Sequence, residues 1–268
     1  MLRFRNLASG STGNATVVEA LDEASGRLRP TRLLVDCGLG IRQLQTRLAT
    51  AELLLQDIDA IFITHEHSDH IGCAEKLAQR LGVPVWMSRG TRAALERMDF
   101  GQTWCEARDG GAITVGDLAL TPFTVPHDAR EPLQLTCTDG RRKLGILTDL
   151  GVATPHVMQH LQQCQALIIE CNHDPDLLAA SRYPYFLQRR IAGNHGHLAN
   201  AHAAEIVTAL MQPDAHDPLG LLVAAHLSQE NNRPELARQH LEQAVAHASV
   251  QPEIAVADPV LGTTWHTV

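Results

Sequence analysis

Short apolar runs separated by turn residues recur along the whole chain, a pattern that is typical of buried β-strands. In the first part of the chain these runs predict strands at residues 16–18, 33–35, 57–63 and 85–87. Later runs predict strands at residues 166–170, 220–225 and 253–257. The polar stretch 22–32 predicts a long hairpin loop between the first two strands.

Amphipathic segments with helix start and stop signals lie between these strands. They predict helices at residues 74–81, 91–98, 154–164, 199–211 and 234–248. The first of these helices is expected to end at Gly82, just before Pro84. The pairs Gly116-Asp117 and Asp139-Gly140 stand between apolar runs and predict two hairpins.

Strands dominate this pattern, and the helices intervene singly. Such an order predicts two sheets packed face to face with helices outside them, a four-layer αββα sandwich. A doubly wound α/β sheet fits the same order of elements. Because the 268 residues contain no repeat, low-complexity tract or linker, we expect one domain that spans residues 1–268.

The composition, 44% hydrophobic and 19% charged, is that of a globular protein with a sizeable core. The most apolar stretch, Leu219 to Ala225, is too short to span a bilayer, and the N-terminal segment lacks the apolar region of a signal peptide. We therefore expect a cytoplasmic protein that does not interact with membranes. Its six cysteines lie far apart and are expected to be buried thiols rather than disulfides.

A net charge of −8 argues against a generally basic surface for nucleic acid. Bound divalent metals and local arginines can nevertheless supply a positive field. The fifteen histidines are more informative, because histidines grouped at metal-ligand spacings need a chemical reason.

Three histidines and an aspartate stand within six residues, directly after the predicted strand that ends near Thr64. At the period of a strand, His65 and His67 point to the same side of extended chain. Asp69 and His70 follow in a turn that leads toward a helix. Imidazole nitrogens and carboxylate oxygens suit zinc, manganese or iron. The segment therefore predicts a metal site.

The pattern His-x-His-x-Asp-His at residues 65–70 resembles the signature of the metallo-β-lactamase superfamily. In that family three later residues, each at the end of a strand, complete a two-metal site. The matching positions in this chain are His127, Asp149 and His226. The resemblance implies one metal on His65, His67 and His127 and a second on Asp69, His70 and His226, with Asp149 between them.

Two adjacent divalent ions can acidify a shared water and clamp the oxygens of an in-line displacement. The resemblance therefore implies hydrolysis in which a metal-bridging hydroxide is the nucleophile and Asp69 helps to orient it.

Residues 196–204 and 225–228 are similar to the late motifs of the phosphodiesterase branch, which includes tRNase Z. There a histidine on the loop before a helix assists departure of the leaving oxygen, and His197 matches its position. An imidazole near metals can be raised in pKa and donate such a proton. Without the family context, His197 is expected to be a helix cap or a surface residue.

Three further segments, residues 7–15, 170–174 and 226–232, resemble the YycJ (WalJ) branch of the superfamily. Members of that branch are 5′→3′ exonucleases that act on double-stranded DNA and are linked to DNA repair, so the resemblance implies that activity here. The chain departs from the branch at Cys171, where the branch has Ser. It also has Ala199 where the family usually has Ser, which removes one hydroxyl that can hold substrate.

Candidates for holding the substrate are arginines, whose planar guanidinium can bond two phosphate oxygens. They are Arg42, Arg47, Arg182, Arg189, Arg190 and Arg233, with Arg182 the residue we select. Asn172, His173 and Asn231 are expected to line the substrate pocket. The alternative interpretation is that the arginines lie on ordinary solvated helix faces and that the other residues bond neighbouring loops.

Three other functions fit the same metal ligands. A hydrolase of small phosphodiesters or cyclic nucleotides, similar to PhnP-type enzymes, is favoured by the low basicity, since binding of duplex DNA usually recruits several cationic contacts. Thiolesterase or lactamase activity is opposed by the Gly-His-Leu motif at 196–198. A catalytically silent binding protein on the same fold would be expected to have lost ligands, and all seven positions are intact.

Overall fold

The strands of the computed structural model, which describes residues 1–22, 26–211 and 218–268, form two seven-stranded sheets. The first sheet has the order β14-β1-β2-β3-β4-β5-β6. The bounds of its strands are β1 Leu2–Ala8, β2 Ala15–Ala20, β3 Thr31–Val35, β4 Ala60–Phe62, β5 Val85–Met87, β6 Trp104–Glu106 and β14 His266–Thr267.

The second sheet has the order β13-β12-β11-β10-β9-β8-β7. The bounds of its strands are β7 Ile113–Val115, β8 Leu118–Thr124, β9 Leu133–Thr138, β10 Lys143–Leu147, β11 Ala166–Glu170, β12 Leu221–Ala225 and β13 Glu253–Val256.

Strand direction brings several carboxyl ends to one edge of each sheet. In the second sheet, β10, β11, β12 and β13 are parallel neighbours, and β9 is antiparallel to both β8 and β10. Strand β8 therefore runs in the same direction as β10, β11 and β12. In the first sheet, β3, β4, β5 and β6 are parallel. Residues that follow β3 and β4 thus lie at one edge of the first sheet, and residues that follow β8, β10 and β12 lie at one edge of the second.

The register fixes the level at which these residues emerge. Ile169 of β11 pairs with Leu147 of β10 on one side and with Ala224 of β12 on the other. Because side chains alternate along a strand, a slip of one residue would turn every following side chain to the other face. The buried cores on both faces of this sheet hold the register.

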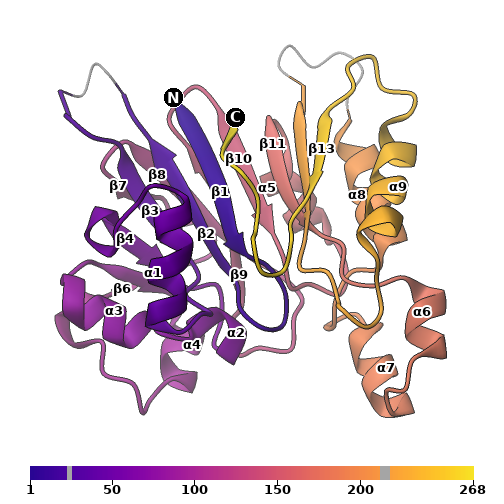
Figure 1. Ribbon diagram of the computed structural model, residues 1–268, viewed down its shortest axis with the longest axis horizontal. Helices are drawn as coiled ribbons and strands as arrows, with labels where there is room; N and C mark the ends of the chain where they lie inside the picture. The colour runs from indigo at the N-terminus through magenta and orange to yellow at the C-terminus, as the bar shows by residue number, and fades with distance from the viewer. Residues whose placement is uncertain (23–25, 212–217) are drawn as a thin grey trace.

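Helices cover the outer face of each sheet, and Figure 1 shows α1 and α3 on one side of the sandwich and α8 and α9 on the other. The helices of the described residues are α1 Ile41–Thr50, α2 Ser68–Ile71, α3 Ala74–Leu81, α4 Arg89–Ala94, α5 Pro155–Leu161, α6 Pro175–Ala180, α7 Tyr185–Ile191, α8 Asn200–Leu210 and α9 Pro234–Val245.

Three apolar clusters separate the four layers. Inner-face residues of both sheets, such as Phe4, Phe62 and Ile168, form the central cluster. A second cluster joins the first sheet to helices α1 and α3, and a third joins the second sheet to α5, α8 and α9. This arrangement confirms the predicted four-layer αββα sandwich, and the two separate sheets exclude a doubly wound single sheet.

Most predicted elements are present, with shifts at their ends. The two predicted hairpins are the β7–β8 and β9–β10 pairs, and α3 ends with Gly82 in the left-handed conformation, as predicted. The strand predicted at 57–63 is wrong over its first part, because residues 55–57 form a 3₁₀ turn and β4 covers only Ala60–Phe62. Helix α4 begins earlier than predicted, because the hydroxyl of Ser88 accepts from the Thr91 amide and caps its N-terminus, and it ends at Ala94.

Other elements have no counterpart in the predicted pattern. They include strands β1, β6 and β14 and helices α1, α6 and α7. The predicted loop 22–32 joins β2 and β3, but its residues 23–25 lie outside the described residues. All six cysteines are free thiols, and five of them are buried, as predicted. No helix in the described parts of the chain is both long enough and apolar enough to cross a membrane.

Candidate metal centre

The seven predicted metal ligands meet at the edge of the sandwich where strand ends of the two sheets face each other. His65 and His67 follow β4, and Asp69 and His70 lie on the short helix α2. From the second sheet come three residues that follow β8, β10 and β12: His127, Asp149 and His226. Residues that are far apart in the sequence therefore share one site.

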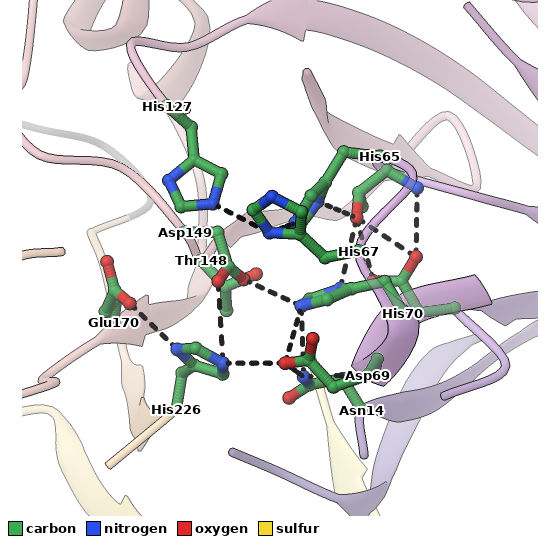
Figure 2. A network of polar contacts seen from close by, with 12 residues as sticks. Asn14, His65, His67, Asp69, His70, His127, Thr148, Asp149, Glu170 and His226 are labelled. Atoms are coloured by element: carbon green, nitrogen blue, oxygen red, sulfur yellow. Dashed lines mark hydrogen bonds and ion pairs between the residues drawn. The ribbon is translucent and has the colours of Figure 1, made fainter. Parts of the chain in front are cut away.

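Potential ligand atoms converge in overlapping groups, each within 4.8 Å. The groups made up of the predicted ligands alone are His65–His67–His127, His65–His70–Asp149 and Asp69–His70–His226, and a further group joins Asp149 and His226 to Glu170 and His197. Figure 2 shows Asp149 between the His65–His67–His127 group and the Asp69–His70–His226 group. The Asp149 carboxylate lies 3.2 Å from His70 Nε2 and 3.5 Å from His226 Nε2.

Hydrogen bonds behind the imidazole rings fix which nitrogen faces the centre. His70 Nδ1 donates to Asp36 at 2.7 Å, and His127 Nδ1 donates to the Gly196 carbonyl at 3.0 Å. His226 Nδ1 donates to Glu170 at 2.9 Å. Because a neutral imidazole with Nδ1 protonated has its lone pair on Nε2, these contacts direct the three Nε2 lone pairs into the site.

Glu170 is the most connected of these supporting residues. It is fully buried, and one of its oxygens accepts from His226 Nδ1 and also from His197 Nδ1, the latter at 2.8 Å. Its other oxygen accepts from the backbone amides of Leu150 and Leu198. A buried carboxylate with four donors is satisfied, and it orients two histidines together.

The centre fits a bound cation on two observations. Asp149 Oδ2 and His226 Nε2 are buried in the site and have no hydrogen-bond partner among the described residues. Unpartnered buried polar atoms are rare, and here both are electron-pair donors aimed at their neighbours. His65 Nε2 also lies only 3.0 Å from His67 Nδ1, which in turn lies 3.4 Å from His127 Nε2. Such a convergence of lone pairs is favourable around a metal ion.

Backbone conformation at the site is also unusual. Five non-glycine residues of the described chain have positive φ, and three of them, Asp36, Asp149 and His226, belong to this centre or to its support. Such a conformation in a residue with a side chain costs on the order of 1 kcal/mol or more, and persists where the surroundings over-determine it. The strand ends thus hold these side chains in a strained but defined position.

The carboxylates of the site are ionised because histidines surround them. Burial raises the pKa of Asp69, but the nearby imidazoles of His226 and His70 outweigh burial and hold that pKa below its ordinary value. Burial also raises the pKa of Glu170, but the charge and hydrogen bond of His197 and the hydrogen bond of His226 lower it to about 2. Both groups therefore carry negative charge at neutral pH.

The histidines of the site differ among themselves. Burial lowers the pKa of His65 well below its usual range, and neighbouring imidazoles add to this effect. Burial acts in the same direction on the pKa of His197, but the charge and hydrogen bond of Glu170 outweigh it and raise that pKa. His65 is thus a neutral donor of a lone pair, whereas His197 holds a proton more readily than a free histidine.

Both predicted catalytic residues border a cavity of about 260 Å³. Asp69 and His197 line it together with residues of the centre and of helix α7. The His197 side chain remains 23% exposed, while its Nδ1 is engaged by Glu170, so Nε2 is the atom available to a substrate.

The four predicted substrate-binding residues do not belong to the described lining of this cavity. Asn172, His173 and Asn231 are at most 5% exposed, and Asn172 donates from its side chain to the His226 carbonyl. In the part of the chain that the structure describes, His173 Nδ1 and both side-chain polar atoms of Asn231 have no hydrogen-bond partner. In this structure these three residues are therefore buried beside the centre rather than in its cavity, while Arg182 is exposed next to the lining residue Tyr183. Their contact with substrate stays a prediction.

Three residues that support the centre have no role in the sequence-based prediction. They are Asn14, Asp36 and Glu170. Asn14 contacts Asp69 and His70 with its side-chain amide, at 3.3 Å and 3.0 Å. Asp36 and Glu170 stand at strand ends, the same signal that identifies Asp149 and His226, and that signal could have found them.

Comparison with known families agrees with this geometry. Residues 31–216 match the model of the family described as "Beta-lactamase superfamily domain". The chain belongs to this superfamily. It is accordingly a hydrolase of the metallo-β-lactamase fold, whose His and Asp clusters can bind metal.

Two relatives in the superfamily cover nearly the whole chain. The chain is 35% identical to "Exodeoxyribonuclease YycJ" of Bacillus anthracis, over 90% of this chain and 88% of the relative. It is 30% identical to "Exodeoxyribonuclease WalJ" of Streptococcus pneumoniae, over 92% and 90%. Among solved structures, the metallo-β-lactamase fold protein YhfI of Bacillus subtilis has a TM-score of 0.71 at 16% identity, with 98% of each chain covered, which shows the shared fold.

Proposed function

We propose that the chain is a two-metal phosphodiester hydrolase and, more specifically, a 5′→3′ exonuclease that acts on double-stranded DNA. The observation that carries the proposal is the convergence of seven His and Asp side chains, in overlapping groups, beside an open cavity. The two exodeoxyribonucleases that match along nearly the whole chain support the substrate class.

The residues present fit two divalent cations. His65, His67 and His127 would hold one, Asp69, His70 and His226 would hold the other, and Asp149 would contribute to both. Such nitrogen and oxygen donors suit zinc, manganese or iron. When bound, ions of this kind neutralise developing charge on phosphoryl oxygens and make water a better nucleophile at neutral pH.

Asp69 and His197 would act on the substrate from two sides of the cavity. Asp69 is ionised and 19% exposed, so its free oxygen can accept a hydrogen bond from an attacking water and orient it. His197 has a raised pKa and an exposed Nε2, so it can donate a proton to the leaving oxygen. Glu170 keeps the ring of His197 in the required orientation.

A small phosphodiester is the second candidate substrate, and one observation favours it. Among the described residues that line the cavity, Arg190 is the only arginine or lysine, and its guanidinium is already paired with Asp128 at 2.6 Å. A cavity with so little free positive charge can accept a short substrate as well as a polymer end.

Labelled DNA distinguishes the candidates. The protein is loaded with manganese or zinc and incubated with 5′- and 3′-labelled duplex DNA, single-stranded DNA and a chromogenic phosphodiester, beside the Asp69→Ala variant. We expect mononucleotides released from 5′ ends of the duplex by the wild type and not by the variant. Turnover of the chromogenic ester without any cleavage of DNA would overturn the exonuclease and leave the small-substrate hydrolase.

A further inference from the structure

Helix α7 displays two large aromatic side chains to solvent. Tyr185 is 71% exposed and Phe186 is 74% exposed, and α7 contains no buried residue. Aromatic residues are only 4% of the chain, yet both of its tyrosines, Tyr183 and Tyr185, lie here. Burying a side chain of this size stabilises a folded protein by about 1.5–3 kcal/mol. Two adjacent aromatic side chains that remain exposed are therefore uncommon.

The exposed pair adjoins the candidate active site. Leu187, Arg190 and Ile191 of the same helix line the cavity, with Tyr183 just before the helix. At 100° per residue these three helical positions share one face. Phe186 lies beside that face, four residues before Arg190, and Tyr185 projects from the opposite side of the helix. A strand that leaves the cavity over α7 would therefore meet Phe186 first and Tyr185 beyond it. In Figure 1, α6 and α7 extend beyond the edge of the two sheets at the lower right.

The segment that contains α7 is positively charged in an otherwise acidic protein. The chain has 30 acidic residues and a net charge of −8, yet no Asp or Glu stands between Asp176 and Glu205. Arg182 and Arg189 are exposed in this interval. The Arg189 guanidinium lies 5.8 Å from the centre of the Tyr185 ring and 3.4 Å from its hydroxyl, so a cation stands directly beside an exposed ring.

From these observations we infer that α7 is a stacking platform for a single-stranded stretch of nucleic acid next to the bond that is cut. Bases stack on Tyr185 and Phe186, and the phosphates between them pair with Arg182 and Arg189. Aromatic rings flanked by arginines are the usual means by which proteins hold unpaired strands, since every base has a stacking face. The inference rests on the proposed function, because it assigns how a polymeric substrate reaches that same site.

Binding and cleavage are measured on the Tyr185→Ala/Phe186→Ala double variant. In the Asp69→Ala background, fluorescence anisotropy with a labelled single-stranded oligonucleotide should show affinity weakened about 10- to 100-fold, as expected for loss of base stacking. In the active protein, kcat/KM on duplex DNA with an unpaired 5′ end should fall similarly, while turnover of a chromogenic phosphodiester stays unchanged. The conservative variant Tyr185→Phe/Phe186→Tyr keeps both rings and should bind like its parent.

A second pair of changes tests the pairing between arginines and phosphates. In Arg182→Gln/Arg189→Gln the slope of log affinity against log salt should become shallower by about 0.7 for each phosphate that is no longer neutralised by an arginine. The matched control is Val260→Ser/Leu261→Ser, which removes two exposed apolar side chains that belong neither to α7 nor to the described cavity lining and should change neither quantity.

The outcomes separate the inference from the proposed function. If the parent protein cleaves DNA and both α7 variants bind and cleave it equally well, the platform is refuted, and the rings are left to contact a protein partner. If the parent protein hydrolyses only the chromogenic ester and does not bind the oligonucleotide, the proposed function fails and the platform fails with it. Loss of chromogenic turnover in the α7 variants would also contradict the inference, since it would mean that the helix shapes the centre itself.

Discussion

The metal centre and helix α7 border the same cavity but are built in opposite ways. Each predicted ligand of the centre follows a strand or lies on the short helix α2, and its position is set by sheet register and by cores on both faces of the sheet. Carboxylates such as Glu170 stand behind the histidines and are fully buried. In contrast, α7 has no buried residue and exposes Tyr185 and Phe186.

From this difference we expect the centre to carry out the reaction and α7 to influence which substrates bind. A side chain fixed by the register of a sheet cannot move without disturbing the core, so the reaction depends on the most constrained part of the fold. A helix that contributes nothing buried can change its outer residues at little cost in stability. Changes in the centre should therefore affect every phosphodiester alike, whereas changes on α7 should affect polymers alone.

The largest effect is expected for His67→Ala. His67 is a predicted ligand whose side chain is 32% exposed, so its removal should leave the fold intact while removing one donor. Hydrolysis of both DNA and a chromogenic phosphodiester should fall by more than about 100-fold, because outer partners of metal ligands alone are worth roughly 10- to 100-fold. Elemental analysis of the purified variant should show less bound metal.

The exposed His247 supplies the matched control, since His247→Ala removes a histidine from a surface position outside the site. It should keep both activities and its full metal content. Retention of either activity by His67→Ala would contradict the assignment of His67 as a ligand. It would also remove the contrast between the metal centre and α7.

An intermediate effect is expected for Glu170→Gln. The amide keeps the shape of the side chain but loses the charge that holds two histidine protons, at His197 and His226. Both activities should fall by roughly 10- to 100-fold, as is typical of such supporting residues. Steady-state kinetics on the two substrates and competition with a chelator give the readouts. A loss confined to DNA would show that the centre and α7 are not separable.

The centre is far more predictable from the sequence than α7, for a physical reason. His65 to His70 form a dense motif after a buried strand, and Asp149 and His226 stand at strand ends that apolar runs already mark. Residues 175–191, in contrast, carry no apolar periodicity, because neither short helix there packs a continuous face against the core. Without that signal, the sequence does not predict α6 and α7.

Burial is also hard to infer from a motif. The segment around His173 is predicted to line the pocket and resembles a motif of the YycJ branch, yet His173 is 2% exposed. Strand β1 is missing from the predicted pattern because the Ser-Gly segment that follows it is typical of a loop, although β1 pairs with both β2 and β14 inside the first sheet. Such tertiary pairing with the distant C-terminal segment has no local pattern in the sequence.

The smallest effect concerns His173, which joins β11 to α6 and so lies between the two regions. Burial lowers the pKa of His173 to about 4, whereas an unfolded histidine has a pKa of about 6.5. As the pH falls through this interval, the His173 imidazole is protonated in the unfolded chain but stays neutral in the folded chain. Stability should therefore fall with acidification, by about 2 kcal/mol between pH 7 and pH 5 from this group alone.

Urea denaturation in the presence of EDTA, at pH 7 and pH 5, measures this effect by comparison with His173→Gln. The variant should lose less stability on acidification than the wild type by that amount, whatever its stability at pH 7. Equal losses in the two proteins would show that His173 is accessible to protons in the folded state. That result would support the sequence-based prediction that His173 lines the cavity.

The centre takes its predicted ligands from both sheets, and this position can affect how long the folded protein survives. His65 follows a strand of the first sheet and His226 a strand of the second, and a long stretch of chain separates them. Contacts of such high sequence separation are slow to form, because a long loop must close first. A cation held by both sheets binds only the state in which they have docked, and it stabilises that state by mass action. Metal supply would then govern how long each copy escapes proteolysis, as well as whether it can work.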